Sequence, residues 1–146
     1  MPRARSKANA VWEGDLAHGG GRVAPESGAF PEQEVTWASR TARSAGKTSP
    51  EELIAAAHAS CFAMAFSHGL AEAGHTAERV EVSAEVTFDT DAGPKITTSE
   101  LTVNARVPGI DEARFQEIAN GAKEGCPVSG ALKGNVEFVL NATLES

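Results

Sequence analysis

The segment from Ser49 to about Ala73 constrains the fold more than any other part of the chain. It opens with a Ser-Pro-Glu-Glu run at 49–52, which supplies a serine N-cap, a proline at the first helical position and a capping-box glutamate. Gly74 follows as a natural terminator. Nearly every position from Leu53 to Phe66 is apolar, and a helix that is apolar on all sides requires burial on all sides. The sequence therefore predicts a central helix that packs against a second copy of itself.

Alternating apolar residues predict strands on both sides of this helix. Before it, short strands are expected over 7–16, 22–24 and 34–40. After it, we expect a strand over 80–88, a returning strand over 101–107 with a bulge near Thr98, and a last strand over 136–144.

Two further helices are predicted between the last two strands. Asp111 can cap the first, whose apolar residues have i, i+3, i+4, i+7 spacing and which ends at Gly125. Pro127 can begin a short one that runs to about Lys133. The element order is βββαββααβ, without repeats or a linker. It indicates a single domain over 1–146 with an α+β fold and a mainly antiparallel sheet.

Charge and hydropathy narrow the classes of partner. The net charge of −7 argues against nucleic-acid binding, which requires a clustered positive face. No apolar signal-peptide core follows the basic residues near the start. The longest apolar run is interrupted by His58 and Ser60, so no membrane span is expected. We therefore expect a cytoplasmic protein, in which thiols are normally reduced and a disulfide is transient or catalytic.

The two cysteines have different settings. Cys61 lies midway along the central helix, where burial raises a thiol pKa and the helix N-terminus is too far away to lower it. A plain buried hydrophobe is the commonest role for such a cysteine, and a reactive thiolate here needs a cation from elsewhere in the fold. Cys126 precedes Pro127 and is expected at the N-cap of the short helix, where the helix dipole favours a thiolate.

His58 lies three residues before Cys61, on the same face of the helix. The pair is compatible with a Cys–His catalytic dyad or with two ligands of a metal ion, but no second ligand pair has metal-like spacing. A packed, hydrogen-bonded histidine is the favoured interpretation. We expect no metal site and no cofactor.

Several arginines could supply the cation. Arg40 and Arg43 lie just before the central helix, and Arg22 follows a run of three glycines. Spacing alone selects none of them over the others.

The chain resembles the OsmC/Ohr family, the osmotically inducible and organic-hydroperoxide-resistance peroxidases. Four stretches carry the resemblance, in order: Trp12-Glu13-Gly14-Asp15, the run from Thr48 to Phe62, Val107-Pro108-Gly109-Ile110-Asp111, and the run from Ala122 to Ser129. The first stretch and the residues just before Cys61 are closer to the OsmC branch, since the Ohr branch usually has tyrosine at the position of His58.

The resemblance implies a thiol peroxidase that reduces organic hydroperoxides with an external dithiol. It implies an intertwined homodimer with long central helices wrapped by antiparallel sheets and with shared active sites. Cys61 corresponds to the peroxidatic cysteine, Cys126 to the resolving cysteine and Glu51 to the family's glutamate. The active-site arginine corresponds to Arg40 in the OsmC-like pattern, whereas the Ohr-like pattern places it nearer Arg22.

Two other functions remain open at the level of sequence. One is a hydrolase with a Cys61–His58 pair, and the other is a stress or binding protein in which the cysteines are incidental.

Overall fold

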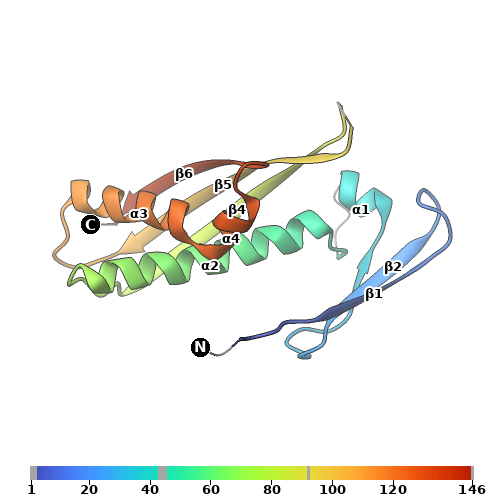
Figure 1. Ribbon diagram of the computed structural model, residues 1–146, viewed down its shortest axis with the longest axis horizontal. Helices are drawn as coiled ribbons and strands as arrows, with labels where there is room; N and C mark the ends of the chain where they lie inside the picture. Colours follow the sequence, from blue (N-terminus) through green and yellow to red (C-terminus); the bar gives the residue numbers. More distant parts are fainter. Residues whose placement is uncertain (1–2, 43–45, 92, 146) are drawn as a thin grey trace. The chain divides into compact units, whose positions relative to one another are not determined.

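A computed structural model describes residues 3–42, 46–91 and 93–145 (Figure 1). The chain forms two compact units, residues 1–50 and 51–146. The first unit carries a small sheet and one short helix, and the second carries a larger sheet and the remaining helices. Both sheets and the helices give the expected α+β class.

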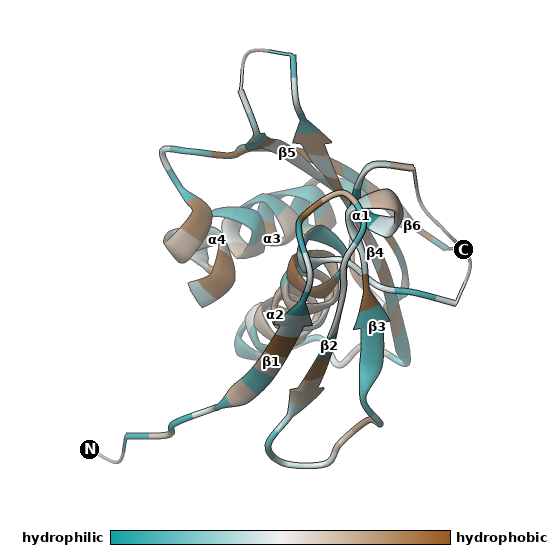
Figure 2. Ribbon diagram, turned by 90° about the vertical axis from the view of Figure 1, so that its right-hand side faces the viewer, coloured by the Kyte–Doolittle hydropathy of each residue, from teal (hydrophilic) through white to brown (hydrophobic). Residues whose placement is uncertain are grey.

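The N-terminal unit is a three-stranded antiparallel sheet followed by a helix. Its strands are β1 (Ala8–Glu13), β2 (Gly20–Pro25) and β3 (Gln33–Val35), in the order β1-β2-β3. All of β1 is exposed, although it includes the hydrophobic stretch that Figure 2 shows in brown.

The strand predicted over 34–40 is wrong beyond Val35. Residues Trp37–Ala42 form helix α1 instead, so the observed order has one more helix than the predicted one. The cause is a reciprocal capping exchange: the Thr36 N–H donates to Ser39 Oγ and the Ser39 N–H donates to Thr36 Oγ1, both at 3.0 Å. Two local hydrogen bonds at a helix start thus outweigh the β propensity of the flanking residues.

The C-terminal sheet has the order β4-β5-β6, with β4 (Arg79–Asp89), β5 (Lys95–Arg106) and β6 (Glu137–Leu144). β4 and β5 are antiparallel, and the register shifts where Thr87 pairs with Thr98 but Phe88 pairs with Ile96, which confirms the bulge near Thr98. β6 runs parallel to β5, because two helices intervene and return the chain to the same end of the sheet.

Three helices belong with this sheet. The long helix α2 (Pro50–Glu72) and α3 (Glu112–Gly125) run alongside it in Figure 1, and α4 (Pro127–Leu132) follows α3 directly. Gly74 has a φ of 88°, as expected for the terminator of α2. Asp111 caps α3 by accepting the Arg114 N–H at 2.7 Å. α2 begins at Pro50 as predicted, and the predicted caps of α3 and α4 are confirmed.

One apolar core fills the C-terminal unit. α2 contributes a buried stripe at four-residue spacing, His58, Phe62, Phe66 and Leu70. The stripe packs with inward residues of β5 and with α3: Leu101, Val103, Ala105, Phe115 and Ala119. Opposite this stripe α2 is exposed, and Met64 is 73% accessible.

α2 is also long and apolar enough, by length and composition, to cross a membrane. Contrary to the sequence-based expectation, His58 and Ser60 do not lower its average hydropathy enough to exclude a span. The core helix of a soluble protein has the same properties, and α2 contributes a buried stripe to the core.

Candidate active site

Cys61 lies at the edge of the buried stripe of α2. Its neighbour Phe62 is fully buried, whereas the thiol itself is partly exposed. Burial raises the pKa of Cys61, and the adjacent Cys126 raises it further, while a backbone hydrogen bond from Val128 acts in the opposite direction. Within these surroundings the thiol is favoured over the thiolate, as the sequence predicts.

Cys126 is the N-cap of α4 and is only 1% exposed. The residue before a proline is held in an extended conformation, and Cys126 has φ −68° and ψ 138°. This geometry turns its sulfur back over the first turn, where Sγ accepts the Ser129 N–H at 3.4 Å. The predicted N-cap position is confirmed.

The fold brings the two cysteines together. Cys126 lies near enough to Cys61 to raise the pKa of its thiol, and both are free thiols. One comes from the middle of α2 and the other from the α3–α4 junction, 65 positions later in the chain. Two thiols in contact can form a disulfide if one of them is first oxidised.

His58 is fully buried beneath this pair. Its Nδ1 lies 2.7 Å from Ser99 Oγ, and its Nε2 lies 2.8 Å from Ser129 Oγ. The ring also packs on Phe138, with 5.2 Å between centroids. Burial lowers the pKa of His58, so the neutral imidazole is favoured.

The packed, hydrogen-bonded histidine predicted from the sequence is confirmed. Both ring nitrogens of His58 are taken by serines, so neither faces Cys61 as a catalytic dyad requires. The sequence analysis missed Ser99 and Ser129. A signal for Ser99 existed, because this serine is in phase with the apolar residues Leu101 and Val103 on the inward face of β5.

An apolar groove of about 700 Å³ opens beside Cys61. α2 and α3 form its walls, with Pro127 at one end. Two of its lining residues, Gly121 and Gly125, have no atom within 4 Å of the position that a Cβ would take. The groove can therefore receive an apolar group next to the Cys61 sulfur.

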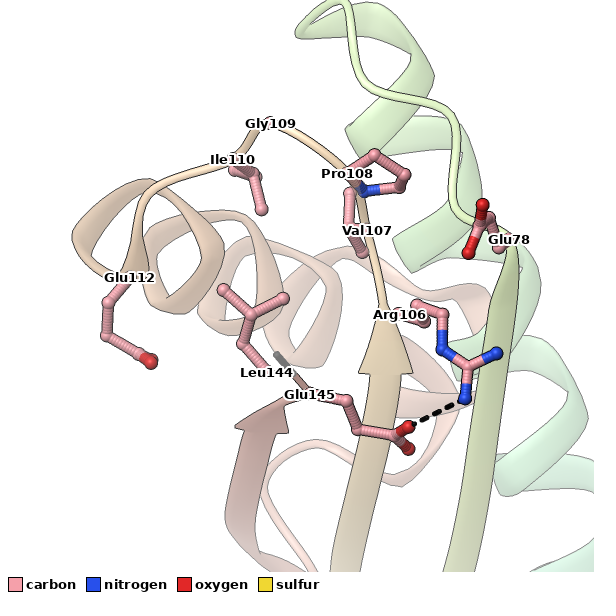
Figure 3. Close-up of a pocket in the computed structure, with 9 residues that line it drawn as sticks. All are labelled: Glu78, Arg106, Val107, Pro108, Gly109, Ile110, Glu112, Leu144 and Glu145. Carbon is pink, nitrogen blue, oxygen red and sulfur yellow. Dashed lines mark hydrogen bonds and ion pairs between the residues drawn. The ribbon is translucent and has the colours of Figure 1, made fainter.

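A second hollow, of about 580 Å³, lies at the C-terminal ends of β5 and β6 (Figure 3). The side chains of Arg106 and Glu145 point toward one another there and form an ion pair at 3.4 Å. Among the described residues that line it there is no cysteine, histidine or serine.

The remaining predicted residues lie in different parts of the chain. Arg40 is on α1 of the N-terminal unit, and Glu51, which is 5% exposed, is in the first turn of α2. Arg22 lies on β2 and forms ion pairs with Glu13 and Glu32. Arg43 lies outside the described residues. In the part of the chain that the structure describes, no three His, Cys, Asp or Glu side chains gather as a metal site.

Two free thiols in contact beside an apolar groove, on an α+β scaffold, define a thiol-based redox protein. Comparison with known proteins gives the particular family. A family model described as "OsmC-like protein" matches residues 43–141. The Escherichia coli (strain K12) protein "Peroxiredoxin OsmC" is 46% identical over 141 residues, which cover 96% of each chain.

Relatives in the second branch also match. The Bacillus subtilis (strain 168) "Organic hydroperoxide resistance protein OhrB" is 35% identical over 100 residues, 64% of this chain and 68% of the relative. The crystal structure of the Bacillus subtilis OhrB superimposes with a TM-score of 0.74 and 29% identity, covering 94% of this chain and 98% of the other. The chain thus belongs to the OsmC family and is a thiol peroxidase.

Proposed function

We propose that this protein reduces organic hydroperoxides to alcohols with an external dithiol, through a Cys61 sulfenic acid and a Cys61–Cys126 disulfide. The observation that carries the proposal is the contact between the two thiols at the edge of an apolar groove. Relatives that are named for organic hydroperoxide resistance support the choice of substrate. Burying an alkyl chain contributes roughly 0.8 kcal/mol per methylene, so the groove favours alkyl hydroperoxides over hydrogen peroxide.

In the first step, the Cys61 thiolate attacks the distal peroxide oxygen. The O–O bond breaks, Cys61 becomes a sulfenic acid and the alkoxide leaves as an alcohol after taking up a proton. Because burial and Cys126 raise the pKa of Cys61, this step needs a cation. We assign that role to Arg40, which would also stabilise the departing alkoxide.

Glu51 would hold the guanidinium of Arg40 in place. It is a carboxylate that is only 5% exposed, and a buried carboxylate requires a cationic or hydrogen-bonding partner. A bidentate pair with arginine is the strongest such arrangement. Arg22, whose side chain forms ion pairs with Glu13 and Glu32, is the alternative candidate.

In the second step, the Cys126 sulfur attacks the Cys61 sulfenic sulfur and water is released. An external dithiol then reduces the disulfide by thiol–disulfide exchange, which restores both thiols.

We further propose a homodimer with shared active sites. α2 is continuous from Pro50 to Glu72, so Glu51 and Cys61 are separated by about 15 Å along its axis and point in different directions. A single arginine cannot bridge them within one chain. An antiparallel partner helix beside α2 would bring the partner subunit's Glu51 toward Cys61.

Mixed dimers test the shared site. Cys61→Ser and Glu51→Ala homodimers are expected to be inactive, whereas their heterodimer regains one complete site and about half of the activity per dimer. Heterodimers as inactive as both parents would mean that Glu51 acts within its own chain.

A steady-state peroxidase assay tests the function itself. Purified protein is given cumene hydroperoxide or hydrogen peroxide with a lipoyl dithiol, a thioredoxin-like protein or a small dithiol. We expect turnover with at least one dithiol, a higher kcat/KM for the organic peroxide, no turnover in Cys61→Ser and a single turnover in Cys126→Ser. Equal kcat/KM for the two peroxides would contradict an apolar substrate site, and turnover by Cys61→Ser would contradict the mechanism.

Two further proposals, on domain organisation and on cellular compartment, rest on the sequence. We propose that both units form one OsmC domain, since the family match spans parts of each. We also propose that the protein works in the cytoplasm, where a reducing environment would supply the dithiol.

A further inference from the structure

A chain of hydrogen bonds leads from the Cys126 sulfur to the buried histidine. Cys126 Sγ lies 3.3 Å from Ser129 Oγ, and Ser129 Oγ lies 2.8 Å from His58 Nε2. On the other side of the ring, Nδ1 lies 2.7 Å from Ser99 Oγ. α4, α2 and β5 each contribute a member, so this chain of contacts exists only in the folded unit.

All of these contacts are satisfied when neutral His58 carries its proton on Nδ1. If the His58 Nδ1–H donates to Ser99, Nε2 is free to accept the Ser129 hydroxyl proton. The Ser129 oxygen can then accept the S–H of Cys126. His58 is neutral in this arrangement, which agrees with the lowering of its pKa by burial.

Helix capping does not explain why the Ser129 hydroxyl contacts the Cys126 sulfur. Cys126 already caps α4 through the backbone N–H of Ser129, and that contact does not need the hydroxyl. His58, Cys126 and Ser129 are 0%, 1% and 1% exposed, so bulk water does not reach the Cys126 proton directly. The Ser129 hydroxyl offers a proton that leaves this sulfur a route through protein groups.

We propose that His58 accepts the Cys126 proton through the Ser129 hydroxyl when Cys126 attacks the Cys61 sulfenic acid. This inference rests on the proposed function, and it adds a residue to the resolving step. Ser129 touches the reacting sulfur, whereas His58 acts through Ser129 and is oriented by Ser99.

The Cys126 proton moves to the Ser129 oxygen while the Ser129 hydroxyl proton moves to His58 Nε2, which leaves a thiolate and an imidazolium. The thiolate forms the S–S bond as the S–O bond of the Cys61 sulfenic acid breaks. The departing hydroxide takes up one proton and leaves as water, and His58 returns to the neutral form. No external oxidant is needed, because Cys61 was oxidised in the preceding step.

The groups that surround this route define its pH dependence. Ser99 from β5, Ser129 from α4 and Phe138 from β6 contact His58, and Cys61 from α2 and Ser129 contact Cys126. The titratable groups among these contacts are the two thiols and the imidazole itself. A thiolate and an imidazolium attract each other strongly in a buried site, which offsets the low basicity of a buried histidine.

Rapid-quench experiments separate the two chemical steps. Full-length protein is mixed with one equivalent of cumene hydroperoxide at pH 6.5, quenched with acid and analysed by mass spectrometry. Cys61 sulfenic acid and the Cys61–Cys126 disulfide are followed separately. Ser129→Ala removes the hydroxyl but keeps the capping N–H, and His58→Gln keeps a hydrogen-bond acceptor but removes the base. Phe138→Leu perturbs the ring packing and leaves both hydrogen bonds of His58 in place, so it is the matched control.

We expect sulfenic acid to form at the wild-type rate in all three variants, which also shows that they are folded. Disulfide formation should slow at least tenfold in Ser129→Ala and His58→Gln, and less than twofold in Phe138→Leu. The double variant should be no slower than either single one, because both interrupt the same route. Raising the pH toward 9 should restore much of the lost rate, since hydroxide can then remove the proton.

The other outcomes separate failure of the proton relay from failure of the proposed function. Wild-type disulfide rates in Ser129→Ala overturn the relay and leave the proposed function standing, even if His58→Gln fails to fold. Equal slowing by Phe138→Leu, or slowing that does not respond to pH, would reduce His58 to a packing role and overturn the relay. Absence of any disulfide in the wild-type protein would instead overturn the proposed function.

Discussion

The two compact units differ in how they bury their apolar side chains. The C-terminal unit surrounds one continuous core, in which Phe62, Phe66, Leu101 and Phe115 are fully buried. The N-terminal unit leaves large apolar side chains in the open: Val11, Trp12, Leu16 and Phe30 are all more than a third exposed. The C-terminal unit therefore has a core of its own, but both the N-terminal unit and the face of α2 that carries Met64 present apolar surface that a partner could cover.

The residues of the proposed active site are also divided between the two units. Both sulfurs, the buried histidine and the apolar groove belong to the C-terminal unit. The arginine proposed to activate Cys61 belongs to the N-terminal unit. Burial and Cys126 favour the neutral thiol of Cys61, so under the proposed function the thiol pair and its activating cation come from different regions of the chain.

The largest expected effect is on stability. Phe66→Ala should lower the free energy of unfolding by about 3–5 kcal/mol, because it opens a cavity in the core. Val11→Ala, at an exposed site of β1, should cost less than about 1 kcal/mol. Urea unfolding of both variants at one protein concentration measures the difference. A cost for Val11→Ala equal to that for Phe66→Ala would mean that β1 is covered as completely as the core.

The next largest effect is on peroxidase activity and on the reactivity of Cys61, and it follows from the removal of Arg40. Arg40→Ala should lower kcat/KM for cumene hydroperoxide by about 10²–10³-fold, as for the loss of one group that stabilises transition-state charge. Alkylation of Cys61 should also shift to higher pH, since burial and Cys126 then raise its pKa without opposition from the cation. Arg22→Ala is the matched control and should change kcat/KM less than twofold. The reverse order of the two variants would assign the role to Arg22.

A smaller effect is the pH dependence of the free energy of unfolding, which we expect from the buried His58 and not from the exposed His18. The folded protein resists protonation of His58, so below pH 6.5 the unfolded chain binds more protons. The free energy of unfolding should therefore fall as the pH falls from about 6.5 toward 5, by at most about 1.4 kcal/mol per pH unit. His58→Gln should remove this dependence. His18→Gln, in the exposed pair with Asp15, should leave it unchanged. Unfolding curves at several pH values test both, and an unchanged slope in His58→Gln would contradict the assignment.

The smallest effect concerns the groove. Gly121→Ala adds a methyl group to open space that lines the groove, without a clash and with better helix propensity. We expect KM for cumene hydroperoxide to change severalfold while kcat/KM for hydrogen peroxide stays within twofold. Gly130→Ala is the control, because its added methyl group also meets open space and does not line the groove. Equal effects on both peroxides would remove the groove from the substrate site.

Elements with local signals were predictable from the sequence. The capping run at 49–52, the alternation over 80–88 and the cysteine before Pro127 each specify structure within a few residues. They gave α2, β4 and the N-cap position of Cys126, all confirmed by the structure.

Features that depend on distant residues were not predictable in the same way. The parallel pairing of β6 with β5 depends on how α3 and α4 return the chain. The partners of His58 lie 41 and 71 positions away, at Ser99 and Ser129. α1 was missed for a different reason, since the exchange between Thr36 and Ser39 was hidden by strand-forming neighbours. Proximity of the two cysteines followed only from the family resemblance.

Peptide mapping of the oxidised protein shows whether Cys61 and Cys126 form a disulfide. Protein reduced beforehand is treated with one equivalent of cumene hydroperoxide, alkylated to block remaining thiols, digested without reductant and analysed by mass spectrometry. The account predicts a disulfide between the Cys61 and Cys126 peptides of one chain, absent before treatment and lost on adding a dithiol. Free Cys126 beside an over-oxidised Cys61, or two free thiols after complete consumption of the peroxide, would contradict it.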